Sequence, residues 1–145
     1  MKTHAFRLTK GQDLKQEIVK YCKENHIYAG YVACCVGCVD ELNIRLAGGE
    51  LFFKDKNDYE IVSITGTLSK DGVHIHASFS DITGKTIGGH LSDGCIINTT
   101  AEIILHELEY TFTREYDAST GYKEIVMSKF HCLNTNHFPL LWNWG

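Results

Sequence analysis

The stretch "DGVHIHASFSDITGKTIGGHLSDG", Asp71 to Gly94, decides the fold and holds three of the chain's eight histidines. Across residues 73–80, apolar side chains alternate strictly with two histidines and two serines. This alternation is typical of a β-strand that buries one face and exposes the other. Residues 86–91 also predict a strand, which can pair antiparallel to the first across the turn at 81–84. The stretch therefore predicts two neighbouring strands of one sheet.

The rest of the chain predicts further strands and one strong helix. In residues 11–25, apolar side chains recur every four positions from Leu14 to Cys22, as on the buried face of an amphipathic helix. Thr9 and Gln12 have the spacing of a capping box in front of it. Short β-rich segments separated by turn residues follow. We expect strands at residues 30–39, 43–47, 59–68, 102–113 and 122–130. The predicted class is α+β, with a central, mostly antiparallel sheet.

The composition indicates one folded domain over residues 1–145. A chain of this length with 43% hydrophobic and 22% charged residues can build one sizeable core. No apolar run reaches the roughly 18 to 20 residues that span a bilayer, and residues 1–10 lack the apolar core of a secretory signal. We therefore expect a cytoplasmic protein that does not enter a membrane, with its six cysteines reduced. The apolar tail from about residue 131 is expected to dock on the domain or on a neighbouring subunit.

The three histidines of the opening stretch form a candidate metal site. His74 and His76 project from the same face of one strand, about 6.6 Å apart along it, and His90 lies on the predicted neighbouring strand. Three neutral imidazoles with an open position suit Zn²⁺ best, and Ni²⁺, Fe²⁺ or Cu²⁺ less well. Gly88 and Gly89 would let a backbone, a ligand or a neighbouring chain come close. The alternative is a half-exposed polar face on which the three histidines make ordinary hydrogen bonds.

Other chemistry-bearing patterns are weaker. Cys35 and Cys38 form a CxxC pair, but no helix N-terminus or second pair accompanies them, so core packing is the better interpretation. His106 can equally be a paired surface residue. The sequence contains no nucleophile elbow and no phosphate-binding glycine loop, and no acid/base pair can be inferred from the spacing of its carboxylates. The catalytic residues, if the chain has any, stay unknown.

Several segments together resemble one known family. They are "RLTKGQDLKQEIVKYCKENHI" (Arg7 to Ile27), "YEIVSITGTLS" (Tyr59 to Ser69), "GVHIHASFSDITGKTIGGHLSDG" (Gly72 to Gly94), "AEIIL" (Ala101 to Leu105) and "REYDASTGYKEI" (Arg114 to Ile125). In this order they resemble the PPC domain, named for plants and prokaryotes conserved. The resemblance implies a sandwich-like α/β arrangement with helices flanking the sheet, a homotrimer, and a cytoplasmic protein of bacteria or archaea. It also implies metal binding by His74, His76 and His90.

The resemblance also implies DNA as a partner, because prokaryotic members of the family are often labelled DNA-binding. In plant relatives an AT-hook, a short Arg-Gly-Arg-Pro segment, inserts into the minor groove. Here Pro139 is the only proline and its neighbours are not basic. The net charge of −4 and the pI of about 6.0 also give no field that would gather nucleic acid. The residues themselves therefore give little reason to expect DNA.

We expect a non-enzymatic, trimeric binding or regulatory module with a three-histidine zinc site, nominally DNA-binding. The alternative is a metal-dependent enzyme that acts on a small molecule through the same histidines. A cupin-like oxygenase is disfavoured, since it needs a glutamate about four residues after the HxH pair, where this chain has Ser80 and then Asp81. Direct DNA binding is the third hypothesis, and it predicts an affinity that falls steeply between about 50 and 200 mM salt.

Overall fold

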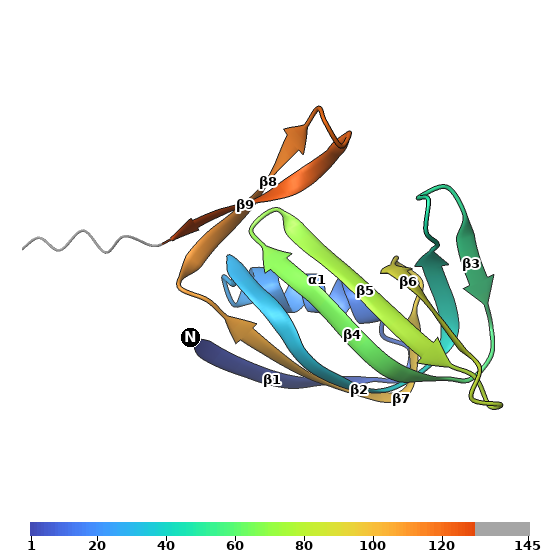
Figure 1. Ribbon diagram of the computed structural model, residues 1–145. Coiled ribbons are helices and arrows are strands. Elements are labelled where there is room, and N and C mark those ends of the chain that lie inside the picture. The colour runs from blue at the N-terminus through green and yellow to red at the C-terminus, as the bar shows by residue number, and fades with distance from the viewer. Residues whose placement is uncertain (130–145) are drawn as a thin grey trace, which may run out of the picture.

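The computed structural model describes residues 1–129, in which antiparallel strands form most of the chain and one helix lies against them (Figure 1). In chain order the elements are β1 (Lys2–Thr9), α1 (Leu14–Glu24), β2 (Ala29–Arg45), β3 (Phe52–Asp55), β4 (Tyr59–Ser69), β5 (Gly72–Ser80), β6 (Thr86–Leu91), β7 (Ile96–Glu107), β8 (Tyr110–Asp117) and β9 (Tyr122–Lys129). The predicted α+β class with a mostly antiparallel sheet is confirmed. The resemblance implied several flanking helices, but α1 is the only helix in the described part of the chain. The predicted tail from about residue 131 lies outside the described residues.

Seven strands form one sheet in the order β1-β7-β2-β4-β5-β6, with β3 paired to β2, and every pairing in it is antiparallel. The last strand of this order returns to the third, because β6 also pairs with β2. That pairing sets Ile44 opposite Leu91 and Arg45 opposite His90. Strands β2, β4, β5 and β6 therefore form a closed ring, and β7 and β1 extend the sheet from β2.

The long strand β2 makes this closure possible. It has 17 residues: β4 and β7 pair with it within residues 29–41, and β3 and β6 pair with its end, within residues 42–45. Its register against β7 shifts at three places, which bend the strand. At one of them a Cβ on Gly37 would collide with the carbonyl oxygen of Thr100, so the position needs glycine. The two strands predicted at 30–39 and 43–47 are therefore one strand, since bulges rather than a turn absorb the irregular residues.

Helix α1 covers the inner face of the sheet. Leu14, Ile18 and Cys22 are buried, as the four-residue spacing predicted. The helix begins later than expected, because Asp13 is the N-cap and its side chain accepts from the backbone N–H of Gln16 at 3.0 Å. The Gln12 side chain accepts from the backbone N–H of Thr9 at 2.7 Å and from its hydroxyl at 3.2 Å, in the turn before the helix. Within residues 1–129, no helix is long and apolar enough to cross a bilayer.

The core lies between α1 and the inner face of the ring. Its largest fully buried side chains include Phe79 from β5, Leu91 from β6, Ile44 from β2 and Leu14 from α1. Each side chain of this size contributes roughly 1.5–3 kcal/mol when it is removed from water. The burial of these side chains therefore holds the strands in place, and the opposite face of each strand is exposed to solvent.

Two described strands have no counterpart in the sequence-based expectation. β1 buries only His4 and Leu8, so its sequence shows no clear alternation of apolar and polar residues. β3 has four residues, which alternate between exposed and half-buried, and none of them is buried. In addition, the strand predicted at 102–113 is two strands, β7 and β8, because the chain leaves the main sheet after Glu107.

Strands β8 and β9 form a separate two-stranded sheet that stands away from the main sheet (Figure 1). Phe112 attaches it to the body: its side chain is buried, its N–H donates to the carbonyl oxygen of Tyr28, and its own carbonyl oxygen accepts from the N–H of Lys70, both at 3.0 Å. The N–H of Arg114 donates to Asp71 Oδ2 at 2.9 Å. This hairpin therefore has a fixed base beside the start of β5.

Candidate metal site

The three predicted histidines lie together on the outer face of the ring. On β5, His74 and His76 are exposed while Ile75 and Ala77 between and after them are buried, as the alternation predicted. On β6, His90 is directly opposite His76 across the antiparallel pair. Directly opposed residues share one face of a sheet. The register of β5 and β6 therefore brings all three imidazoles to one place.

The distances between these imidazoles are short. The Nε2 atoms of His74 and His76 are 3.2 Å apart. The ring centroids are 5.0 Å apart for His74 and His76, 5.1 Å for His74 and His90, and 5.7 Å for His76 and His90. One nitrogen from each ring lies within 4.8 Å of the other two. In residues 1–129 this is the only group of three such side chains that could hold a metal ion.

The environment keeps two of the three rings neutral near pH 7. Partial burial, and then the positive charge of Arg45, lower the pKa of His90 from 6.5 to about 4. Partial burial, and then His76 and Arg114, lower the pKa of His74, while Glu124 opposes that shift. Neutral imidazole is the form that binds a metal. The site is therefore ready to accept a cation without first losing protons from these two rings.

The donor set fits a small divalent cation. Two nitrogens of a tetrahedral zinc site with bonds of about 2.05 Å lie about 3.3 Å apart, close to the 3.2 Å between His74 and His76. The Nδ1 atom of His90 is buried and has no hydrogen-bond partner. A buried polar atom without a partner is costly, so this ring also has unused binding capacity. Three protein nitrogens would leave one tetrahedral position for another ligand.

Beside the histidines is an open groove of about 820 Å³. Its floor is the outer face of β5 and β6, one wall is the turn after β2, and the other wall is the β8–β9 hairpin. Gly48 and Gly49 in the turn both have positive φ, +88° and +80°, which favours glycine. Tyr122 approaches this turn, because a Cβ on Gly49 would lie 3.2 Å from the Tyr122 hydroxyl. The two walls therefore nearly meet.

The two glycines before His90 serve backbone packing. A Cβ on Gly88 would lie 2.9 Å from the carbonyl oxygen of Ala77, and one on Gly89 would lie 2.5 Å from that of Arg45. The sequence allowed a backbone, a ligand or a neighbouring chain to come close to these glycines, and the structure shows a close approach of backbone. The glycines let β6 fit between β5 and β2, and so place His90.

The sequence-based search missed the charged residues around the histidines. Arg45, Arg114, Lys123 and Glu124 line the groove together with Tyr122. Arg45 lies at the end of β2 and the others lie on the hairpin, so no local spacing connects them with the HxH pair. The one available signal was composition, since the chain has only three arginines and two of them lie here.

The other sequence candidates have ordinary structural roles. Cys35 is a buried core residue, and burial raises the pKa of its thiol to about 12, as the core-packing interpretation predicts. Cys34 is exposed, and the five cysteines in residues 1–129 are free. His106 is paired, with Nδ1 2.7 Å from the hydroxyl of Tyr31. His4, which drew no attention in the sequence, is buried, and its Nε2 lies 2.9 Å from Glu107.

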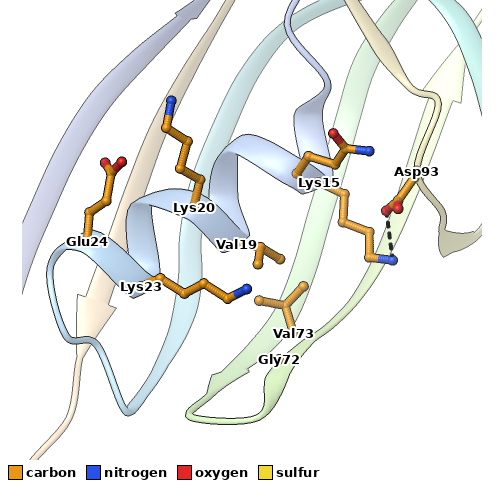
Figure 2. Close-up of a pocket in the computed structure, with 9 residues that line it drawn as sticks. Lys15, Val19, Lys20, Lys23, Glu24, Gly72, Val73 and Asp93 are labelled. Carbon is orange, nitrogen blue, oxygen red and sulfur yellow. Dashed lines mark ion pairs between the residues drawn. The ribbon is translucent and has the colours of Figure 1, made fainter.

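A second hollow lies beside α1, and Figure 2 shows its lysine-rich rim. Lys15, Lys20 and Lys23 come from the helix, and Val73 closes the other side. The Nζ of Lys15 is 3.0 Å from the carboxylate of Asp93. No metal-ligand cluster forms there within the described residues. The groove with the three histidines is therefore the stronger candidate site.

Comparison with known proteins supports the resemblance found in the sequence. The family profile of the Plants and Prokaryotes Conserved (PCC) domain matches residues 1–109. The bifunctional protein GlmU of Synechococcus sp. strain JA-3-3Ab is 41% identical over 130 residues, which are 89% of this chain and 21% of that protein. The chain thus spans about a fifth of the length of the curated relatives it matches.

Solved structures with the same fold include a hypothetical protein from Salmonella enterica, 33% identical with a TM-score of 0.85 over 88% of this chain and 94% of that one. A candidate DNA-binding protein from Bacteroides thetaiotaomicron is 19% identical, with a TM-score of 0.78 and coverage of 86% and 91%. A metal-containing protein from Archaeoglobus fulgidus is 23% identical, with a TM-score of 0.75 and coverage of 87% and 94%. At these lower identities the last two show the shared fold alone.

Proposed function

This chain belongs to the Plants and Prokaryotes Conserved domain family, and on that basis we propose that it is a non-enzymatic metal-binding module of the cytoplasm. His74, His76 and His90 hold one divalent ion, most readily Zn²⁺. The module is a homotrimer with a regulatory or partner-binding role. The observation that carries the proposal is the convergence of three imidazole nitrogens within 4.8 Å.

Two further points support the metal. The low pKa values of His74 and His90 favour the neutral rings that ligate metal ions. A protein of the same fold from Archaeoglobus fulgidus is metal-containing. The ion, once bound, would supply a Lewis-acid centre with one open position facing the groove.

Elemental analysis of untagged protein, purified without chelator, tests this proposal. We expect about one metal ion per chain in the wild type and none in a His74→Ala/His76→Ala variant. His106→Ala is the control, because His106 is another strand histidine, but it lies outside the cluster and is paired with Tyr31. Metal-free wild-type protein, or equal metal in all three samples, would overturn the metal site.

Exposed apolar side chains on β2 and β7 support the homotrimer. Tyr31 and Val36 on β2 are 38% and 57% exposed, and Ile104 on β7, at 37%, is opposite Cys34. These side chains form an apolar area on the outer face of the main sheet, of the kind that a neighbouring subunit covers. Light scattering should give three times the 16.4 kDa of one chain, and Ile104→Lys should lower that mass. A monomeric wild type would exclude the trimer.

A metal-dependent enzyme is the second candidate, favoured by the volume of the groove, about 820 Å³, which is in the range of small-molecule sites. Turnover of a small substrate that disappears in His76→Ala, with the fold intact, would favour it over the non-enzymatic module. DNA binding has less support, since the net charge is −4. Fluorescence anisotropy with duplex DNA at about 50 and 200 mM salt would detect it as a steep loss of affinity.

A further inference from the structure

The groove beside the histidines is positively charged although the whole chain is not. Arg45, Arg114 and Lys123 line it against the single carboxylate of Glu124, while the chain carries a net charge of −4. A groove lined mainly by one sign of charge concentrates ions of the opposite sign. This local excess therefore favours an anionic ligand.

Neither guanidinium in the groove has an acidic partner. No ion pair joins Arg45 or Arg114 to a carboxylate within residues 1–129. Asp71 accepts from the backbone N–H of Arg114 rather than from its side chain. Arginine without a carboxylate partner is well suited to bind a carboxylate or phosphate, often through two parallel hydrogen bonds.

Arg114 keeps most of its hydrogen-bonding capacity. Its Nη2 donates to Thr67 Oγ1 at 3.1 Å, which holds the side chain beside β4. Its Nε is buried and has no partner, and a donor left in that state costs roughly 1–3 kcal/mol. An oxyanion that draws the guanidinium toward the groove would satisfy it.

The arginines are close enough to the histidines to act on the same ligand. Arg45 and Arg114 line the same groove as His74 and His90. Arg45 is also directly opposite His90 across the β2–β6 pair. When a divalent cation is bound to the three histidines, two uncompensated guanidiniums would lie beside it. Such a cluster of positive charge is unfavourable unless an anion lies between the metal and the arginines.

We propose that the groove binds a small anionic molecule, with its carboxylate or phosphate group held by Arg45 and Arg114 and a second donor atom completing the coordination of the metal. This inference rests on the proposed metal site for the second contact only. The walls set an upper limit on size, because Tyr122 on the hairpin approaches the turn at Gly49. The groove thus suits a small metabolite rather than a polymer.

The arginine contacts lie in two different parts of the chain. Arg45 lies within the 1–109 segment that matches the family profile, whereas Arg114 and Lys123 lie after it. The identity of the ligand therefore depends on residues outside the matched segment as well as on the histidines.

Titration of Co²⁺-loaded protein with malonate and with inorganic phosphate tests the proposal, since the visible absorption of cobalt reports a new ligand on the metal. We expect saturable binding of at least one of the two at concentrations below about 10 mM. Stronger binding of malonate would indicate a carboxylate ligand, and stronger binding of phosphate a phosphate ester. Arg114→Gln and Arg45→Gln should each weaken binding at least about tenfold.

Arg7→Gln is the matched control, because Arg7 is an exposed strand arginine opposite Glu102 on β7, and neither residue lines the groove. It should bind the anion as the wild type does, and all variants should show the wild-type cobalt spectrum before anion is added. Equal binding by Arg114→Gln, Arg45→Gln and Arg7→Gln would mean that the anion contacts the metal alone, and would overturn the proposal. Absence of binding by metal-loaded wild type would also overturn it.

The metal content of the same samples separates the two proposals. Wild-type protein that takes up cobalt but no anion contradicts only the anion site. Wild-type protein that takes up no metal contradicts the proposed function. Calorimetric titration of the metal-free protein with phosphate then tests whether Arg45 and Arg114 bind an anion without the metal. Binding weakened in Arg114→Gln but not in Arg7→Gln would keep the anion site, and no binding would remove it.

Discussion

The two faces of strand β5 differ in what they do for the protein. On the inner face, Ile75, Ala77 and Phe79 are 1%, 5% and 0% exposed and belong to the core. On the outer face, His74 and His76 are exposed and point to the groove. Because successive residues of a strand point to opposite sides, stability and binding are divided between alternate positions of one short segment. Substitutions on the two faces should therefore have separable effects.

The largest effect is expected on the inner face. Phe79→Ala should lower the free energy of unfolding by about 3–5 kcal/mol, because it removes a fully buried aromatic side chain and leaves a cavity. Denaturant unfolding measured by circular dichroism would give this value. A loss below about 1 kcal/mol would mean that the inner face of β5 does not stabilise the fold, and would contradict the division of roles between the two faces.

The outer face should respond in metal affinity instead. His76→Ala removes one of the three proposed ligands, and we expect the metal affinity to fall more than about 100-fold, which corresponds to about 2.7 kcal/mol. The unfolding free energy of the metal-free protein should change by no more than about 0.5 kcal/mol, since the side chain is exposed. Competition with a chelating dye measures the first quantity and denaturant unfolding the second. A metal-free stability that falls as far as in Phe79→Ala would contradict the division between faces.

The glycines of β6 sharpen the comparison, because they pack on both neighbours of the strand. Gly89→Ala should destabilise the protein by about 1–3 kcal/mol, since its Cβ would lie 2.5 Å from the backbone oxygen of Arg45. Gly88→Ala, with 2.9 Å to the oxygen of Ala77, is the matched variant and should cost less. The thermal midpoints of the two variants measure this difference. A lower midpoint for Gly88→Ala than for Gly89→Ala would show that the contact between β6 and β2 is not the tighter of the two.

The smallest expected effect is on pH dependence. The pKa of His90 is about 4 in the folded protein against 6.5 in a solvated histidine, so the unfolded chain binds this proton at higher pH. The resulting stability is complete above pH 6.5 and is lost as the pH falls toward 4. Because the ring is partly exposed, we expect a change on the order of 1 kcal/mol. Denaturant unfolding of metal-free His90→Gln should lack this part of the slope, and an unchanged slope would contradict the assignment to His90.

Local patterns in the sequence were enough to predict the parts of the fold that depend on near neighbours. The alternation in residues 73–80 gave the inner and outer faces of β5, and the four-residue spacing from Leu14 gave the buried side of α1. Both signals are the direct result of backbone geometry and burial. The candidate metal site followed because His90 is only 14 residues after His76 and one turn separates their strands.

Long-range pairing could not be predicted in the same way. The opposition of Arg45 and His90 joins residues of β2 and β6 that no turn connects, and it depends on the bend of β2 against β7. Strand β1 was missed because its partner β7 lies far along the chain, as in the pairing of Lys2 with Glu107. Only two positions of β1 are buried in the structure, which is too few for a recognisable pattern in its sequence. Topology, not local preference, determines these contacts.

The β8–β9 hairpin shares no strand pairing with the main sheet within residues 1–129, yet it supplies one wall of the groove. Its length and sequence can therefore change without altering the register that places the three histidines. Insertions or substitutions near Thr120 and Gly121, at its exposed tip, leave the pairing of β5 with β6 untouched. In a lineage of such chains the three histidines and the groove contacts on the hairpin can diverge at different rates, because they lie on separate structural units, whereas Arg45 lies with the histidines on the main sheet.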